Sequence, residues 1–190
     1  CWKVFCVQRS LLRIDPWRRC PRASATARPK VFESAIAMIH EISVALRDDL
    51  PDPTGEGVAS TLRASGLAGI EGVRFSQRYV VDGDLKAADA RRLADELLAD
   101  PVVEQFEVGG AASDPPGVVS VEIARRPGVM EPCEETLILG AKDLGIVLRA
   151  VRLVRRYAVR GRPEITALRD AAARLLANPV IEEIHLGAKA

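Results

Sequence analysis

The chain has 190 residues, of which 48% are hydrophobic and 28% charged, and its formal net charge is +1. This composition is typical of a folded protein and excludes a disordered chain, and no run approaches the roughly 18 consecutive apolar residues of a transmembrane helix. The charge is uneven, because residues 1–37 hold eight Lys or Arg against two acidic residues, which leaves −5 for residues 38–190. An acidic body gives no electrostatic reason to bind nucleic acid or a membrane surface.

Residues 1–37 are expected to be a leader that lies outside the fold. The segment is rich in Arg, lacks an amphipathic period and is interrupted by Pro16, Pro21 and Pro29. The first Met of the chain is Met38. We interpret the leader as irregular or not native to the folded protein, with a transit peptide as the alternative. The four cysteines fit neither a zinc site nor a disulfide framework, which predicts free thiols and a cytoplasmic location.

Residues 38–110 are predicted to form a strand, a helix, a strand, a helix and a strand. Ile42, Val44 and Leu46 alternate with polar or small residues, which is the period of a half-buried strand. A helix closed by Gly66 follows. The remaining elements are a strand around Val73 to Val81, a helix between Asp84 and Asp100, and a strand from Val102 to Val108.

Residues 118–190 repeat this pattern after a linker at residues 111–117. Residues 73–109 align with residues 151–187 without a gap, and 15 of the 37 positions are identical, where average residue usage predicts roughly two or three. Upstream the alignment continues with a one-residue gap that places Pro53 over Pro132. This similarity indicates an internal duplication.

Each copy has one apolar strand face, which its two amphipathic helices can cover, and one charged face. The predicted fold class is therefore α+β, with two tandem ferredoxin-like β-α-β-α-β sandwiches. Each copy is small enough to be marginally stable alone. Because pairing the copies through their sheets enlarges the shared core, we expect a pseudo-twofold fused dimer.

The sequence contains no recognisable set of catalytic side chains. His40 and His185 lack neighbours at metal-ligand spacing, and neither a phosphate-binding glycine loop nor a nucleophile elbow is present. Cys133 is expected at the start of a helix, where we interpret it as structural. We predict no catalytic residue, no metal site and no cofactor within this chain.

An Arg-Tyr pair occurs twice, at residues 78–79 and 156–157. Strand alternation predicts that each Tyr lies in the apolar core with its hydroxyl at the rim, and that each Arg is exposed on the opposite face. Such arginines can pair with carboxylates of a partner protein or serve as solvated charges that limit aggregation. Glu104 and Glu182 are their expected counter-ions.

Three motifs carry a family resemblance. Ser-Val-Glu-Ile at 120–123 runs into Arg-Pro-Gly-Val at 126–129, Arg-Tyr-Val-Val-Asp-Gly-Asp-Leu occupies 78–85, and Leu-Ala-Asp/Asn-Pro-Val closes both copies at 98–102 and 176–180. Over about residues 38–190 the chain resembles tandem PurS-like units of phosphoribosylformylglycinamidine synthase, as in the N-terminal region of PurL-type chains. The first copy departs from the pattern, because Arg-Asp-Asp-Leu at 47–50 replaces the Arg-Pro-Gly segment.

The resemblance implies a structural, non-catalytic part of a glutamine-dependent, ATP-using C–N ligase in purine biosynthesis. It implies as partners a PurL-type synthase domain and a glutaminase, between which ammonia passes, with ATP, Mg and glutamine used by those partners. The main alternative is a free-standing regulatory module that binds a small metabolite between its two halves. A nucleic-acid-binding module is disfavoured, because aromatic residues are few. The candidate partner-binding residues are Arg74, Arg78, Arg126, Arg152 and Arg156.

Overall fold

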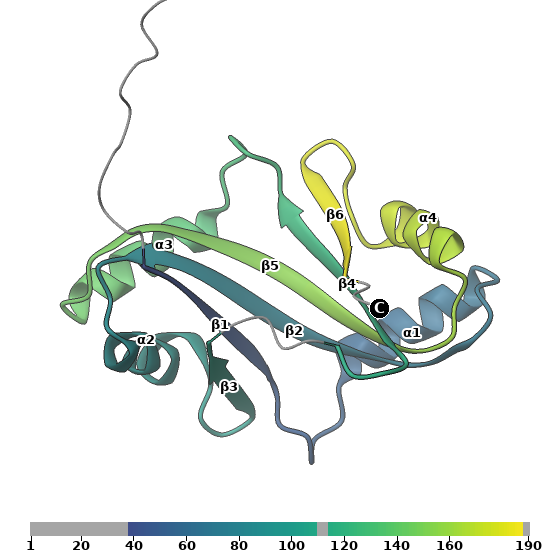
Figure 1. The fold of residues 1–190 in the computed structure, drawn as a ribbon, viewed down its shortest axis with the longest axis horizontal. Coiled ribbons are helices and arrows are strands. Elements are labelled where there is room, and N and C mark those ends of the chain that lie inside the picture. Colours follow the sequence, from purple (N-terminus) through teal and green to yellow (C-terminus); the bar gives the residue numbers. More distant parts are fainter. Residues whose placement is uncertain (1–37, 110–113, 188–190) are drawn as a thin grey trace, which may run out of the picture. The chain divides into compact units, whose positions relative to one another are not determined.

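Six strands form one antiparallel sheet in the computed structural model, which describes residues 38–109 and 114–187 (Figure 1). The sheet order is β3-β1-β2-β5-β4-β6. The strands are β1 (Met38–Leu46), β2 (Ile70–Gly83), β3 (Glu104–Val108), β4 (Val118–Arg125), β5 (Leu148–Gly161) and β6 (Glu182–Gly187). The helices are α1 (Pro53–Ala64), α2 (Ala87–Leu93) with its π-helical continuation η1 (Ala94–Leu98), α3 (Pro132–Asp143) and α4 (Ile165–Leu175).

The described residues belong to one unit, Ile36–Ala190. The predicted leader at 1–37, with three of the four cysteines, lies outside the described residues, as do positions 110–113 of the predicted linker. Within residues 38–109 and 114–187, no helix combines the length and the apolar character that crossing a membrane requires.

The centre of the sheet is the antiparallel pair β2 and β5. Each strand has 14 residues, and Gln77 lies opposite Arg155 at the middle of the pair. At one end of the pair the backbones come close together, and a Cβ atom added to Gly161 would lie 2.1 Å from the carbonyl oxygen of Gly69. Gly161 also has a φ of 127°, which side chains other than glycine rarely adopt. Only glycine therefore fits at this end of β5.

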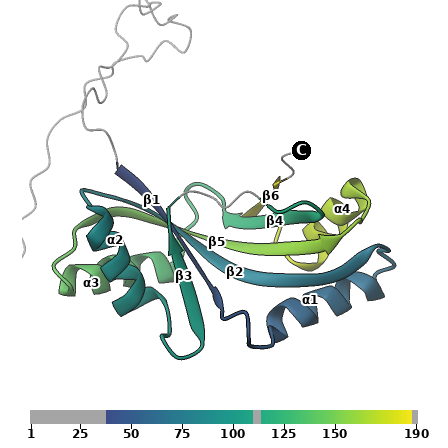
Figure 2. The ribbon, with the colours of Figure 1, turned by 60° about the horizontal axis from the view of Figure 1, so that its bottom comes forward.

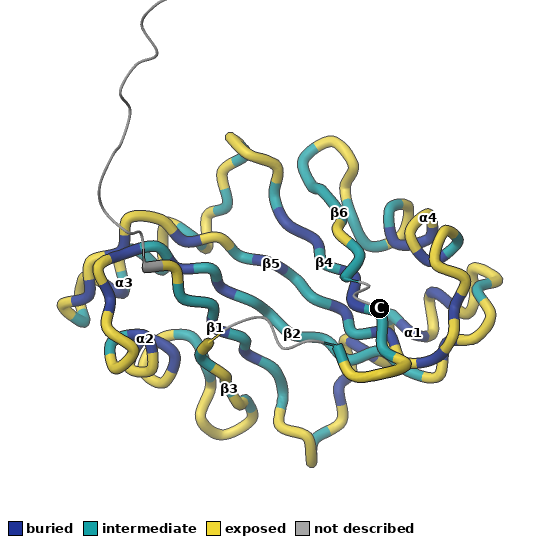
Figure 3. Tube along the Cα trace, viewed as in Figure 1, coloured by how far each residue is buried: buried dark blue, intermediate teal, exposed yellow. Residues whose placement is uncertain are grey.

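All four helices pack on one face of the sheet, and they form two separate hydrophobic cores (Figures 2 and 3). In one core, α2 and η1 pack beside α3 over β1, β2 and β5. In the other core, α1 packs beside α4 over β2, β4 and β5. Fully buried leucines such as Leu62 of α1 and Leu168 of α4 each stabilise the fold by roughly 2 kcal/mol.

Each helix pair combines one helix from residues 38–109 with one from residues 114–187. The α+β class and the order of the predicted elements are confirmed. Each helix lies mainly on strands of its own half, with α1 on β2 and α3 on β5, but the helix beside it comes from the other half. Where η1 and α3 meet, Leu97 of η1 packs over Gly140 of α3, and a Cβ atom added to Gly140 would lie 3.0 Å from Leu97 Cδ1. Three strands alone would also leave the long edge of β2 unpaired, and pairing with β5 satisfies that edge.

Two carboxylates attach the first helix of each half to the middle strand. Asp52 caps α1 by accepting from the backbone N–H of Gly55 at 2.8 Å, and its second oxygen accepts from the N–H of Phe75 on β2 at 2.6 Å. In the second half, Glu134 of α3 accepts from the N–H of Leu153 on β5 at 2.9 Å. Both carboxylates satisfy a strand N–H that would otherwise lack a partner beyond the end of the neighbouring strand.

Candidate partner interface

The strand face opposite the helices, here called the open face, carries most of the predicted site residues. Alternation along β2 and β5 directs Arg74, Arg78, Arg152, Arg156 and Arg160 to this face, whereas the neighbouring apolar residues enter the two cores. The open face is therefore basic along its two central strands, as the sequence predicted. Its chemistry depends on how each arginine is paired.

Arg78 and Arg156 share a carboxylate on the open face. Arg78 Nη2 lies 2.6 Å from Glu122 Oε2 and its Nη1 lies 3.7 Å from Glu41 Oε2. Arg156 Nε lies 3.9 Å from Glu122 Oε1, and its Nη2 pairs with Asp114. The side chains of Arg78 and Arg156 are only 15% and 19% exposed. The expectation that these two arginines are exposed is therefore wrong.

The prediction that Glu104 and Glu182 are the counter-ions of Arg78 and Arg156 is also wrong. Glu104 and Glu182 belong to the helix face of their strands, because the period of two places them opposite the arginine face. Of the actual partners, Glu122 could have been predicted from the sequence, because it alternates with the buried residues Val121 and Ile123. Asp114 was not, because it lies in the predicted linker, whose course no periodicity determines.

The other three predicted arginines also bind partners within the chain. Arg74 donates to the carbonyl oxygen of Leu46 and lies 3.0 Å from Asp48. Arg152 lies 2.5 Å from Glu183, whose pKa it lowers through a hydrogen bond. Arg126 is not on the open face; it donates to the carbonyl oxygens of Pro179 and Glu182, at 3.0 and 3.1 Å, and braces the loop before β6.

Two hollows lie next to each other on the open face. One has a volume of about 360 Å³ and the other about 530 Å³, and both are lined by Arg74, Arg156 and Ala158. Arg160 completes the rim of the larger hollow and is 69% exposed. The linings also contain acidic residues, Glu107 in the smaller hollow and Asp114 in the larger.

A second charge cluster, which the sequence analysis did not identify, lies on the helix face. Arg125 Nε lies 2.6 Å from Glu131, and Arg155 Nη2 lies 2.8 Å from Glu182. Arg125 lies 3.7 Å from Glu182, so the four residues form one network around a cavity of about 240 Å³. The hydrogen bond from Arg125 lowers the pKa of Glu131. The sequence does contain a signal for this cluster, because Arg125 and Arg155 occupy strand positions that alternation assigns to the apolar face.

The two tyrosines lie in the cores, as predicted. Tyr157 is buried and packs against Phe75, with 5.2 Å between ring centroids. The hydroxyl of Tyr79 donates to Gln77 Oε1 at 2.5 Å. Burial raises the pKa of Tyr79 to about 12, and the nearby charges of Glu104 and Cys133 add to the shift. A phenol with so high a pKa stays protonated at neutral pH and is poorly suited to act as a base.

Within the described residues, no group of three or more His, Cys, Asp and Glu side chains could hold a metal ion. His40 Nε2 forms a hydrogen bond with the carbonyl oxygen of Leu85 at 3.0 Å, which ties β1 to the start of α2. His185 is exposed beside Glu183. Cys133 is exposed in the first turn of α3, where it was predicted. The charged side chains described here hold strands and loops together.

An antiparallel sheet with helices on one face is compatible with the ferredoxin-like α+β class expected from the sequence. Residues 39–111 match the family model PurS, described as phosphoribosylformylglycinamidine (FGAM) synthase. The chain is also similar to the phosphoribosylformylglycinamidine synthase subunit PurS of Mycobacterium leprae (strain TN). The identity is 32% over 76 residues, which are 39% of this chain and 92% of that relative. The chain belongs to the PurS family, which confirms the resemblance read from its motifs.

Proposed function

We propose that this chain is a non-catalytic assembly component of FGAM synthase in purine biosynthesis, working in the cytoplasm. It would hold an ATP-dependent PurL-type synthase and a glutaminase together so that ammonia passes from one to the other. The observation that carries the proposal is the similarity to the PurS subunit, which extends over 92% of that relative. ATP, Mg and glutamine would be bound by the partners.

We further propose that the chain is a fused counterpart of a PurS-like dimer, with units at 38–110 and 118–190 joined by a linker at 111–117. The sheet order supports this, because exchanging β1, β2 and β3 with β4, β5 and β6 leaves it unchanged. The register of β2 and β5 supports it too. Gln77 and Arg155 are partners at the centre of the pair, and the gapless alignment matches the same two residues.

The open face is the surface that we assign to a partner. Arg78 and Arg156 are held by carboxylates of this chain, so their role is to keep β1, β2, β5 and β4 in one rigid face. Arg74, Arg152 and Arg160 lie at more exposed positions on the same face. These three can exchange or share their carboxylates when a partner binds, because surface ion pairs contribute little to stability.

Holding two enzymes in fixed register speeds their combined reaction, because it removes the need for a released intermediate to diffuse through solvent. The rigidity of the sheet suits this role. Its two hydrophobic cores are each built from both halves of the chain, so the halves are not free to move apart independently.

The proposal is tested by mixing the chain with a PurL-type synthase and a glutaminase and measuring the mass of the products by size-exclusion chromatography with light scattering. A complex containing all three proteins is expected. If none of the proteins associates with this chain, the assembly role is wrong. A metabolite that raises the melting temperature of the isolated chain, with no partner present, would instead support a regulatory module.

A further inference from the structure

Two loops that lead into the edge strands are braced by the same set of hydrogen bonds. In the first loop (Asp100–Glu104), the N–H of Val102 donates to Asp100 Oδ1 at 2.8 Å, and the N–H of Asp100 donates to Glu104 Oε2 at 2.9 Å. The N–H of Glu104 returns to the carbonyl oxygen of Asp100 at 2.8 Å. The N–H of Arg47 donates to the carbonyl oxygen of Val103 at 3.0 Å. This loop is therefore tied both to itself and to the end of β1.

The second loop (Asn178–Glu182) has the same four bonds. The N–H of Val180 donates to Asn178 Oδ1 at 3.1 Å, and the N–H of Asn178 donates to Glu182 Oε2 at 2.8 Å. The N–H of Glu182 returns to the carbonyl oxygen of Asn178 at 2.8 Å. The N–H of Arg126 donates to the carbonyl oxygen of Ile181 at 2.9 Å. The matching bonds define one loop geometry that occurs twice.

Each loop presents an exposed Pro-Val pair at its tip. Val102 and Val180 are 74% and 78% exposed, and the prolines before them, Pro101 and Pro179, are also exposed. A loop that is already rigid loses little conformational entropy on binding, so an apolar side chain at its tip contributes more of its burial energy to affinity. Each Pro-Val tip is therefore a rigid, exposed apolar projection, here called a knob.

Apart from Leu97 and Leu175, which align and are 36% and 40% exposed, the other strongly exposed apolar residues have no counterpart in the opposite half. Leu139 of α3 is 64% exposed and aligns with Ser60, and Ile165 of α4 aligns with Ala87. Isolated exposed apolar residues are common on protein surfaces and need no function. The Pro-Val tips differ because both the residues and their bracing are present in both halves.

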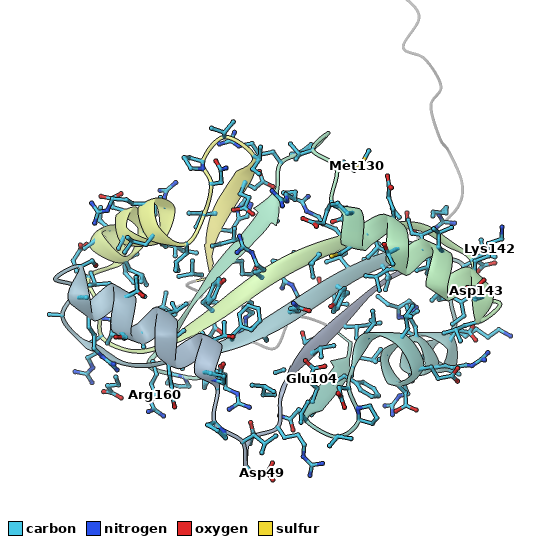
Figure 4. The ribbon with its side chains drawn as sticks, turned by 180° about the vertical axis from the view of Figure 1, so that it is seen from behind. Asp49, Glu104, Met130, Lys142, Asp143 and Arg160 are labelled. Atoms are coloured by element: carbon cyan, nitrogen blue, oxygen red, sulfur yellow. The ribbon has the colours of Figure 1, made fainter. Side chains whose placement is uncertain are left out.

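The two loops lie at opposite edges of the sheet, since β3 and β6 are its two edge strands (Figure 1). Figure 4 shows Asp49 on the same edge as Glu104 of the first loop, whereas Met130 lies at the opposite edge. A single small contact on one partner therefore does not reach both tips. We therefore expect the two tips to contact two separate partner surfaces.

The surroundings of the two tips differ in charge. Beside the first loop lie three exposed carboxylates, Asp48, Asp49 and Asp100, of which Asp48 pairs with Arg74 and Asp49 with Arg47. The aligned positions beside the second loop are uncharged: Pro127, Gly128 and Asn178. The second loop is instead flanked by a hollow of about 300 Å³ whose lining includes Arg126 and Arg169 together with Glu182 and Glu183.

We propose that the two Pro-Val tips are protein-docking knobs that bind different partners. The first tip fits an apolar socket rimmed by Lys or Arg, and the second fits a socket without that basic rim. The exposed carboxylates beside the first loop repel anionic membranes and nucleic acid, so the occupant of the first tip is a protein. This inference rests on the proposed function, because the two partners in question are the synthase and the glutaminase. Charge that favours one partner and opposes the other is a common source of specificity.

The test measures the affinity of the full chain for each partner separately, with the variants Val102→Ser and Val180→Ser. The matched control is Val147→Ser, because Val147 is also 74% exposed but lies in the turn before β5. Val102→Ser is expected to weaken binding to one partner by about tenfold or more and to leave the other within about twofold. Val180→Ser should have the reverse selectivity, and the control should change neither.

Asp49→Lys gives an independent measurement of the charge. It should weaken the same partner as Val102→Ser, and more strongly at about 0.05 M than at about 0.3 M salt. The inference is overturned if both valine variants leave both affinities unchanged, or if both weaken the same partner equally. If the unaltered chain binds neither partner, the proposed function itself is wrong. Equal melting temperatures of the valine variants establish that any loss of binding is not a loss of folding.

Discussion

Arg78 on β2 reaches across β5 to Glu122 on β4, with 2.6 Å between Nη2 and Oε2. The contact joins the two halves of the chain on the open face, and Glu122 also lies 3.9 Å from Arg156. Because both side chains are more than four-fifths covered, removing one of them leaves a charge without its partner in a poorly solvated position.

Replacing Arg78 is therefore expected to destabilise the fold, and not only to weaken assembly. Arg78→Met should lower the free energy of unfolding by about 3 kcal/mol, because it leaves Glu41 without its partner and leaves Glu122 only the more distant Arg156, at 3.9 Å. Adding Glu122→Leu should recover part of the loss, since it removes one of these charges. Denaturant unfolding measures both effects, with the exposed Arg160→Met as the control. Equal stability of Arg78→Met and the control contradicts the role of this network.

The positions of Arg78 and Arg156 show which features of the open face the sequence determines. Alternation placed Arg78 and Arg156 on the correct face, because the period of two is local and strong. It did not determine their exposure. Their exposure depends on Glu122 and Asp114, which come close only when β2 pairs with β5 and Asp114 bonds to Ser120 of β4. Pairing between distant segments lies beyond any local pattern.

The N-cap of α1 gives a second stability prediction. Asp52→Ala removes the hydrogen bonds to Gly55 and to the backbone of Phe75, and should lower the free energy of unfolding by roughly 2 kcal/mol. The matched control is Asp49→Ala, three residues earlier in the exposed turn, which should change stability by less than about 0.5 kcal/mol. Thermal unfolding followed by circular dichroism distinguishes them. Equal melting temperatures for the two variants would show that Asp52 does not anchor the helix.

The shared cores predict the behaviour of half a chain. Residues 38–109 alone lack β4, β5 and α4, which complete the core that contains Ala59 and Leu62 of α1, and they leave the long edge of β2 unpaired. This fragment should therefore be unfolded or dimeric, whereas residues 38–190 should unfold in a single transition. Light scattering and circular dichroism measure the fragment. A folded monomer of 38–109 would contradict the shared cores.

The helix-face charge cluster predicts a pH dependence. Arg125 lowers the pKa of Glu131 below its ordinary value of 4.5, so the charged carboxylate stabilises the folded state above pH 4.5. This contribution is lost as the pH falls through the depressed pKa. Glu131→Gln should therefore flatten the decline in stability on acidification from about pH 6 to about pH 3. The exposed Glu135→Gln serves as the control, and parallel curves for Glu131→Gln and the unaltered chain would contradict the assignment.

The helix-face charge cluster also shows what could not be predicted from the sequence. Arg125 and Arg155 interrupt apolar strand positions, and such interruptions are visible in the sequence. Their partners were not, because Glu131 precedes a helix and Glu182 begins an edge strand. The packing of helices from different halves side by side could not be predicted for a related reason. An amphipathic pattern says that a helix has a buried face, but it does not say which sheet surface that face meets.

The measurement that tests the assembly role most directly compares FGAM formation with glutamine and with free ammonium as the nitrogen source. A synthase and a glutaminase are assayed with and without this chain. Omitting the chain should reduce the glutamine-dependent rate by about tenfold or more and leave the ammonium-dependent rate within about threefold, because free ammonium does not need to pass between the enzymes. An unchanged glutamine-dependent rate without the chain would contradict the proposed role.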